Sequence, residues 1–139
     1  SISVEWCLSH PGTRAISIEA RSDRAAHIRA NAATFGLDNR LSVVEGSAPD
    51  ALADLSAPAA VFIGGGLSNA LLDDLHARLA AGTRLVAHAV TLESEALLAD
   101  WSGRVGGELL RIELAHAAPL GTRRGWTPAR PIVQWQVVL

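Results

Sequence analysis

Short apolar runs alternate along the chain with segments in which leucine or alanine recurs at helical spacing. The apolar runs predict strands over residues 15–19, 41–45, 60–63, 84–90 and 132–139. The helical spacing predicts helices over 22–35, 67–79 and 92–102, with a short helix before Leu55. Strands that alternate with helices are typical of a parallel sheet with right-handed crossovers, so the predicted fold class is α/β.

Two regions follow this pattern less regularly. Ser1 to Leu8 fits both an alternating strand and one face of a helix. Residues 108–116 predict an outer strand, and a loop rich in glycine, proline and arginine separates it from the strand over 132–139. Because no helix lies between these last two strands, we expect them to pair as an antiparallel hairpin at one edge of the sheet.

Polar residues mark the starts of three predicted helices. Ser22, Ser68 or Asn69, and Thr91 each stand where an N-cap side chain accepts a hydrogen bond from the first turn. Glu93 follows Thr91 in the first turn, where negative charge is favourable. For Thr91 and Glu93 this structural role is the strong alternative to any functional one.

The composition is that of an ordinary globular protein. Of 139 residues, 49% are apolar and 19% are charged, and the net charge is −2, so we expect a single domain over 1–139. A slightly acidic chain is a poor partner for nucleic acid. All basic residues are arginines, so an anion site must use guanidinium groups or backbone N–H groups.

The chain shows no signature of a disulfide, a metal site or a membrane span. Cys7 is the only cysteine and no metal-ligand spacing surrounds it, so we expect no metal and a reducing, cytoplasmic location. Residues 55–72 carry no charge, but Pro58 and the glycines at 64–66 interrupt them. His10, His27 and His76 have no partner spacing, and we assign them no role.

Two features indicate a ligand at the carboxyl ends of the strands. Gly64, Gly65 and Gly66 follow a buried strand and allow close approach of a ligand. Glu19 ends the strand over 15–19, where nucleotide-binding sheets place the carboxylate that takes the ribose hydroxyls, with a glycine-rich loop roughly 20 residues earlier. The alternative is a solvated carboxylate at a strand end.

Counting back from Glu19 puts that glycine loop before Ser1. The first strand normally lies at the centre of such a sheet, and a chain without it would leave two inner edges unpaired. We therefore expect the first strand and the glycine loop upstream of residue 1, with Ser1 to Leu8 as the first helix.

Several stretches together resemble the decarboxylating precorrin methyltransferases of cobalamin biosynthesis. These are residues 1–6, 15–21, 43–49 (Val-Val-Glu-Gly-Ser-Ala-Pro), 61–66 (Val-Phe-Ile-Gly-Gly-Gly) and 85–93 (Leu-Val-Ala-His-Ala-Val-Thr-Leu-Glu). Within the family, the chain is similar to the C15-methylating, decarboxylating C-terminal domain of precorrin-6Y C5,15-methyltransferases and to the stand-alone enzymes that act on cobalt-precorrins. The resemblance implies a class I S-adenosylmethionine-dependent fold with a Rossmann-like sheet whose last strand is antiparallel.

The resemblance also implies S-adenosyl-L-methionine as cofactor, S-adenosylhomocysteine as its product and a precorrin as substrate. Glu19 would hold the ribose and Gly46, Ser47 and Ala48 the adenine edge. The family pattern leads us to expect Asp where Ser47 stands and Asn where His88 stands. The complete set of residues that we assign to the cofactor is Glu19, Ala20, Gly46, Ser47, Ala48, Gly64 and Gly65.

Substrate and catalytic residues are expected on the later strands and loops. His88 is the best group to titrate near neutral pH, with a buried histidine bonded to backbone as the favoured alternative; the resemblance adds Thr91 and Glu93. Arginines can clamp substrate carboxylates while Trp126 lies against the flat macrocycle, and a solvated loop is the alternative. We assign to the substrate Gly66, Arg123, Arg124, Trp126 and Arg130.

The leading hypothesis is methylation of a precorrin ring carbon with decarboxylation of an acetate side chain. A nicotinamide-dependent oxidoreductase is an alternative because Glu19 also suits that cofactor, and a non-catalytic binding or assembly module on the same fold is another. The resemblance further implies a homo-oligomer, specifically a homotetramer. Fusion to a C5-methylating domain and the presence of cobalt in the substrate both stay open.

Overall fold

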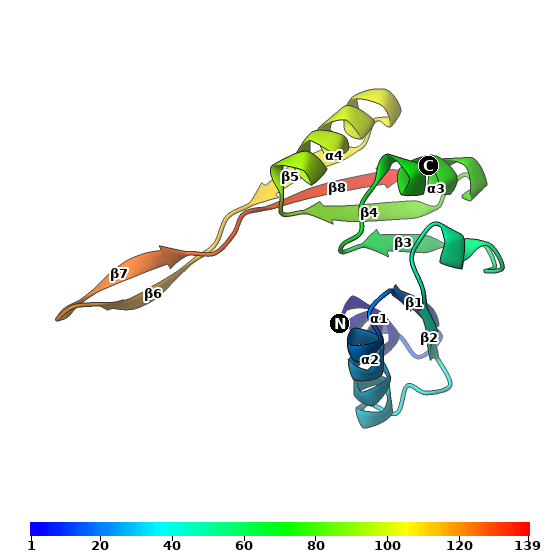
Figure 1. The fold of residues 1–139 in the computed structure, drawn as a ribbon, viewed down its shortest axis with the longest axis horizontal. Helices are drawn as coiled ribbons and strands as arrows, with labels where there is room; N and C mark the ends of the chain where they lie inside the picture. The colour runs from blue at the N-terminus through cyan, green and yellow to red at the C-terminus, as the bar shows by residue number, and fades with distance from the viewer. The chain divides into compact units, whose positions relative to one another are not determined.

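The computed structural model describes residues 1–139, which divide into two compact units, Ser1–Ser56 and Ala57–Leu139 (Figure 1). None of the helices is long and apolar enough to cross a membrane. The elements of the first unit are α1 (Ile2–Ser9), β1 (Ala15–Glu19), α2 (Ser22–Thr34), β2 (Leu41–Glu45) and the 3₁₀ helix η1 (Asp50–Leu52).

In the first unit, both helices pack on one face of a two-stranded parallel sheet. Val4 and Cys7 of α1 and Ala32 of α2 are buried together with Leu37 and Leu41. The helical reading of the first residues is therefore confirmed, because Val4 and Cys7 are three residues apart and share one helix face.

Arg40 fastens the end of α1 to the rest of this unit. Its Nη1 donates to the carbonyl oxygens of Cys7 (2.7 Å), His10 (3.1 Å) and Thr13 (3.2 Å). Carbonyl groups at the end of a helix have no partner within the helix, and a cation is favourable there. One side chain thus satisfies the end of α1 and the loop that leads to β1.

The elements of the second unit are β3 (Ala60–Ile63), α3 (Asn69–Arg78), β4 (Arg84–Ala89), α4 (Leu92–Val105), β5 (Glu108–Ile112), β6 (Ala115–Leu120), β7 (Arg123–Pro128) and β8 (Ile132–Val138). Four of these strands form a sheet in the order β3-β4-β8-β5. β3 and β4 are parallel, and β8 is antiparallel to both of its neighbours, β4 and β5. The predicted antiparallel pairing of the last strand is confirmed, although β8 lies inside the sheet and β5 forms the edge.

Trp101 of α4 joins both helices of the second unit to one face of the sheet. Its Nε1 donates to Asn69 Oδ1 at the start of α3 (3.1 Å), and its ring lies 6.4 Å from that of Trp135 on β8. Alternate residues of β4, among them Leu85 and Ala87, are buried on this face. The helix-covered face therefore carries the core, and Val86 and His88 lie on the opposite face.

Three sequence predictions need correction at their boundaries. Ser22 is the first residue of α2 and not its cap; Arg21 holds the N-cap position without a side-chain capping bond. The short helix before Leu55 is a 3₁₀ turn. The strand predicted over 108–116 ends at Ile112, and a second strand begins at Ala115.

The predicted loop between the last two strands is instead largely a β-hairpin, β6–β7, which forms its own sheet and projects from the rest of the unit as an arm (Figure 1). Its turn is Gly121-Thr122, and Gly121 has φ +59°, the left-handed conformation that two-residue hairpin turns require. Pro119 and Pro128 obscure the pattern in the sequence, because proline is confined to strand positions whose N–H is not needed.

Replacing Arg40 by alanine should lower the free energy of unfolding by about 1–3 kcal/mol, because three carbonyl groups lose their donor. Arg14→Ala is the matched control: its guanidinium makes one exposed hydrogen bond, to the carbonyl of Asn39. Urea denaturation followed by circular dichroism measures both variants. Equal loss in the two would contradict the role given to Arg40.

Candidate functional site

The predicted cofactor residues of the first unit meet at the carboxyl ends of β1 and β2. The two strands pair in parallel from Ala15 opposite Leu41 to Glu19 opposite Glu45. The N–H of Gly46 then donates to the carbonyl oxygen of Glu19 (3.1 Å). The loop that contains Ser47 and Ala48 therefore begins beside Glu19 and Ala20, as a nucleoside site requires.

The Glu19 carboxylate is held so that one oxygen stays available. It is half-buried, and its Oε1 accepts a hydrogen bond from the N–H of Arg21 (3.0 Å), which leaves Oε2 for a ligand. A Cβ on Gly46 would lie 3.1 Å from the Cβ of Ala51, a tight contact that favours glycine at this position. A carboxylate oxygen without a partner at the carboxyl ends of two parallel strands fits a ribose-bearing cofactor such as S-adenosylmethionine.

The charges near Glu19 are arranged in pairs that the sequence reading missed. Arg29 Nη1 lies 2.6 Å from Glu45 Oε1, and Arg21 Nη2 lies 2.8 Å from Asp23 Oδ2. The Arg29 guanidinium, helped by the Ser22 hydroxyl, holds the pKa of Glu45 below its usual value. Only strand pairing reveals that Glu45 lies next to Glu19, because the two are far apart in sequence.

The second unit gathers its candidate residues at one edge of its own sheet. β3, β4 and β5 run in the same direction and β8 runs against them, so the ends of the first three lie beside the start of β8. The residues at this edge are Gly64, Gly65, Gly66, Thr91, Glu113, Arg130 and Pro131. This is the edge at which open α/β sheets bind ligands.

The glycine loop after β3 presents backbone to solvent. Gly64, Gly65 and Gly66 are all exposed, and Gly66 has φ +70°, which a residue with a side chain rarely adopts. The loop ends at Ser68, whose Oγ accepts from the N–H of Leu71 (3.1 Å) and so caps α3. Of the two caps predicted, Ser68 is the one the structure uses.

His88 is half-buried near the end of β4, and its partner is a side chain, where the sequence suggested backbone. Its Nε2 lies 2.9 Å from Oε1 of Gln134, which is opposite it on β8, and its ring meets Phe62 edge to face at 4.9 Å. Gln134 and Phe62 orient this imidazole, and no sequence signal pointed to either.

Thr91 has the structural role that its sequence position suggested. Its Oγ1 accepts from the N–H of Ser94 (3.3 Å) and caps α4. Glu93 is exposed in the first turn of the same helix. A catalytic role for either residue stays a prediction.

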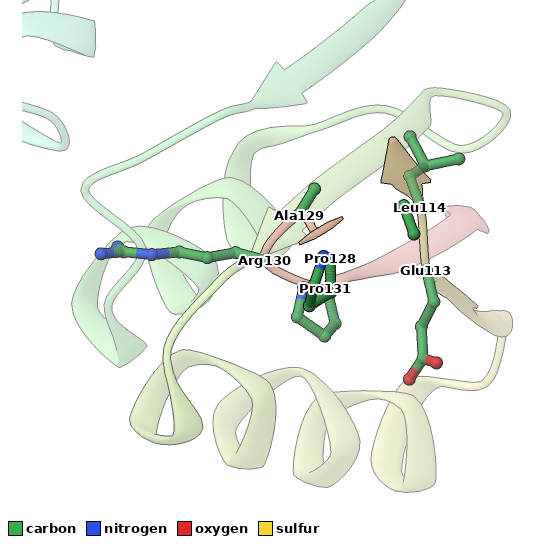
Figure 2. A pocket seen from close by; sticks show the side chains of 7 residues that line it. Glu113, Leu114, Pro128, Ala129, Arg130 and Pro131 are labelled. Atoms are coloured by element: carbon green, nitrogen blue, oxygen red, sulfur yellow. The ribbon is translucent and has the colours of Figure 1, made fainter. Parts of the chain in front are cut away.

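An open groove of about 570 Å³ lies where the arm joins the sheet (Figure 2). Its walls are mostly apolar, and it has one acid and one base, Glu113 and Arg130. Glu113 is already paired, since its Oε1 accepts from Nε of Arg111 (2.7 Å), which raises the pKa of Arg111. Arg130 extends away from Glu113 and forms no ion pair, so it is free for an anionic ligand. The lining residues are Glu113, Leu114, Ala115, Pro128, Ala129, Arg130 and Pro131.

The other predicted substrate residues lie on β7 of the arm. Arg123 and Arg124 are consecutive in this strand, so their side chains leave from opposite faces. Arg124 shares its face with Trp126, which is 77% exposed. The structure therefore brings Arg124 and Trp126 together and separates Arg123 from them.

Comparison with known proteins gives the family and the fold of this chain. The precorrin methyltransferase domain family matches residues 1–139, that is, the whole chain. The chain belongs to this family. Its fold is the α/β fold of the class I S-adenosylmethionine-dependent methyltransferases, which the precorrin methyltransferase domain shares even with an O-methyltransferase from Thermotoga maritima at 14% identity (TM-score 0.66).

Two curated relatives differ in how much of their length this precorrin methyltransferase domain covers. The Sinorhizobium precorrin-6Y C(5,15)-methyltransferase [decarboxylating] is 49% identical over 97% of the chain, which spans 33% of that relative. A probable cobalt-precorrin-6B C(15)-methyltransferase (decarboxylating) of Pyrobaculum calidifontis is 30% identical over 95% of the chain and 70% of its own length. The chain thus spans about a third of the longer relative.

A solved structure supports the same assignment. The C-terminal domain of precorrin-6Y C5,15-methyltransferase from Rhodobacter capsulatus matches with a TM-score of 0.95 and 57% identity, covering 100% of this chain and 74% of that one. The similarity extends over both units of the precorrin methyltransferase domain.

Replacing Thr91 by alanine should lower the free energy of unfolding by about 0.5–2 kcal/mol through loss of the cap, while serine should preserve it. Urea denaturation of the two variants measures the difference. Unchanged stability in Thr91→Ala would contradict the capping role. Aspartate is also a good N-cap residue, so Thr91→Asp separates a capping role from a catalytic role of Thr91. If this variant keeps its stability but loses turnover, Thr91 has a catalytic role in addition to capping α4.

Proposed function

We propose that the protein containing this chain methylates ring carbon C15 of a precorrin with S-adenosylmethionine and decarboxylates an acetate side chain, in cobalamin biosynthesis. One observation supports this choice above others. The relative that the chain covers to 70% is named for C(15) and decarboxylation alone, whereas the longer relative is named for C(5,15). The part common to both, which this chain matches, is therefore assigned the C15 methylation and the decarboxylation.

The cofactor is assigned to the edge of the first unit that Glu19 and the 46–48 loop form. The exposed Gly64 and Gly65 of the second unit remain predicted cofactor residues. Glu19 accepts from the ribose hydroxyls through its free Oε2, and the loop borders the adenine. S-adenosylmethionine supplies an electrophilic methyl group, and the chain's part is to hold donor and acceptor in position. Ser47 offers a short hydroxyl at the adenine edge, so backbone groups carry more of that contact.

The substrate is assigned to the carboxyl edge of the second unit. Precorrins carry many carboxylates on a flat macrocycle, and the groove at the base of the arm combines apolar walls with the unpaired Arg130. Such walls also suit decarboxylation, because a carboxylate that is desolvated beside a conjugated ring loses carbon dioxide more readily. His88, held by Gln134, and the neighbouring Thr91 and Glu93 are the candidates for contact with the reacting ring.

Calorimetric titration of the complete protein with S-adenosylhomocysteine and with NAD tests the cofactor assignment. We expect S-adenosylhomocysteine alone to bind, and Glu19→Ala to abolish measurable binding because the ribose loses its acceptor. Glu5→Ala, an exposed acid on α1, is the control and should bind normally.

Binding of NAD instead would favour the oxidoreductase. Binding of neither would favour a non-catalytic module that keeps the fold. These two results separate the alternatives that the Glu19 feature leaves open.

We propose further that the protein is a homo-oligomer, a homotetramer in particular, that associates through the arm. An isolated two-stranded hairpin is marginally stable in water, and β6–β7 pairs with no other strand. Apolar side chains of the arm and of its base are unusually open: Leu120 is 70% and Trp126 77% exposed on the arm, and Leu114 is 59% exposed just before it. Burial of these residues against other copies removes both liabilities.

Two segments outside residues 1–139 belong to the same proposal. The first strand and its glycine loop, expected upstream of residue 1 from the position of Glu19, form one of these segments, and β1 has a strand partner on one side only. A C5-methylating domain fused to the chain, or working with it, would account for the greater length of the C(5,15) relatives.

We also propose a cytoplasmic location. Cys7 is unpaired, which suits a reducing compartment.

Alanine variants of the arm distinguish substrate contact from subunit contact. Trp126→Ala should shift the protein toward smaller species in analytical ultracentrifugation, because it removes the largest exposed apolar side chain of the arm. Arg124→Ala should weaken tetrapyrrole binding, measured by fluorescence quenching, with little change in assembly. Arg123→Ala is the matched control on the opposite face; if it weakens tetrapyrrole binding as much as Arg124→Ala, the face assignment is wrong.

A further inference from the structure

Two glutamates end neighbouring strands at the edge assigned to the ribose. Glu19 pairs directly with Glu45 across β1 and β2. Parallel strands lie about 4.8 Å apart, and directly paired residues point to the same face of a sheet. Two uncompensated carboxylates at this spacing repel each other, and such a pair retains a proton to a higher pH than either carboxylate alone.

The structure compensates only one member of this pair. Arg29 Nη1 lies 2.6 Å from Glu45 Oε1, and Nη2 of the same guanidinium donates to the carbonyl of Val43 (3.5 Å). Ser22 lies two turns before Arg29 on the same face of α2, and its hydroxyl also bonds to Glu45. The Glu19 carboxylate, by contrast, accepts from one backbone N–H and has no cationic side chain bonded to it.

We propose that Arg29 is a positioning residue for the cofactor: by holding Glu45 against α2, it leaves Glu19 as the single carboxylate that meets the ribose hydroxyls. This inference rests on the proposed role of Glu19 in cofactor binding. Arg29 acts through Glu45 and does not touch the ligand. Without Arg29, Glu45 is free to approach Glu19. The two carboxylates can then share a proton, and Glu45 competes with the ribose hydroxyls for contact with Glu19.

The charged groups around Glu45 determine the pH range over which Arg29 affects cofactor binding. They are Glu19, which is paired with it on β1, and Arg29 on α2. Arg29 holds the pKa of Glu45 below its usual value of 4.5, so the ion pair persists at higher pH and is lost as the pH falls below that value. In the natural protein, cofactor affinity should therefore be constant from neutral pH down to about pH 5.

The experiment is a titration of the complete protein with S-adenosylhomocysteine at about pH 7.5, 6.5 and 5.5. In Arg29→Ala, affinity should fall by about two- to fivefold between the highest and the lowest pH, the range expected of an exposed ion pair. The double variant Arg29→Ala with Glu45→Gln should regain a flat profile, because the second carboxylate is gone. Arg29→Lys should recover much of the affinity, and Arg24→Ala, exposed on the same helix, should behave as the natural protein.

Two results would overturn the inference. One is a flat pH profile in Arg29→Ala with unchanged affinity. The other is weakening of Arg29→Ala and of the double variant to the same extent at every pH, which would mean that Arg29 merely fastens α2 to β2. Failure of the proposed function is distinguishable from both, since the natural protein would then bind no S-adenosylhomocysteine at any pH.

Discussion

The backbone hydrogen bonds between parallel strands are the constraint on which the candidate site depends. Parallel pairing makes strands that are distant in sequence end at a common edge, with a fixed register. In the first unit this places Glu45 and the Gly46 loop beside Glu19. In the second unit the same rule, with β8 running in the opposite direction, brings the glycine loop, the start of α4 and the base of the arm to one edge. The chemistry is therefore organised by strand order more than by any local motif.

The ion pairs at the carboxyl edges of the two sheets determine which charged side chains remain available to a ligand. Glu45 and Asp23 have arginine partners, and Glu113 is bonded to Arg111. Glu19 and Arg130 form no ion pair. A free acid in one unit and a free base in the other are the groups that the proposed function needs for a ribose diol and for a substrate carboxylate. Glu19 and Arg130 are therefore charges at these edges that a ligand would meet without an ion-pair partner.

The arm and the groove at its base are the features that distinguish this fold from a minimal Rossmann-like sheet. The insertion lies between β5 and β8, at the edge where ligands bind, so it changes the substrate side without altering the core around Trp101 and Trp135. Its two strands expose apolar residues that a monomer would normally bury. Association of copies and recognition of a flat macrocycle draw on the same face of β7, which carries both Arg124 and Trp126.

The sequence by itself determined the α/β class, the strand and helix order up to residue 105 and the end positions of Glu19 and the glycines. It could do so because apolar periodicity and capping residues are local signals, as Ser68 and Thr91 illustrate. It also carried enough family-specific residues to indicate the precorrin methyltransferases. The hairpin over 115–128 was missed because Pro119, Gly125 and Pro128 weaken the strand pattern, and its stability depends on cross-strand pairing.

Only the tertiary structure decided which side chains are neighbours. Gln134 against His88 is a contact set by strand register, and Arg29 against Glu45 is a contact set by packing of a helix on a sheet. The separation of Arg123 from Arg124 likewise appears only once that segment is known to be a strand. A one-residue change in the register of β4 and β8 would give His88 a different partner while leaving the sequence pattern intact, and this is why no local reading could find Gln134.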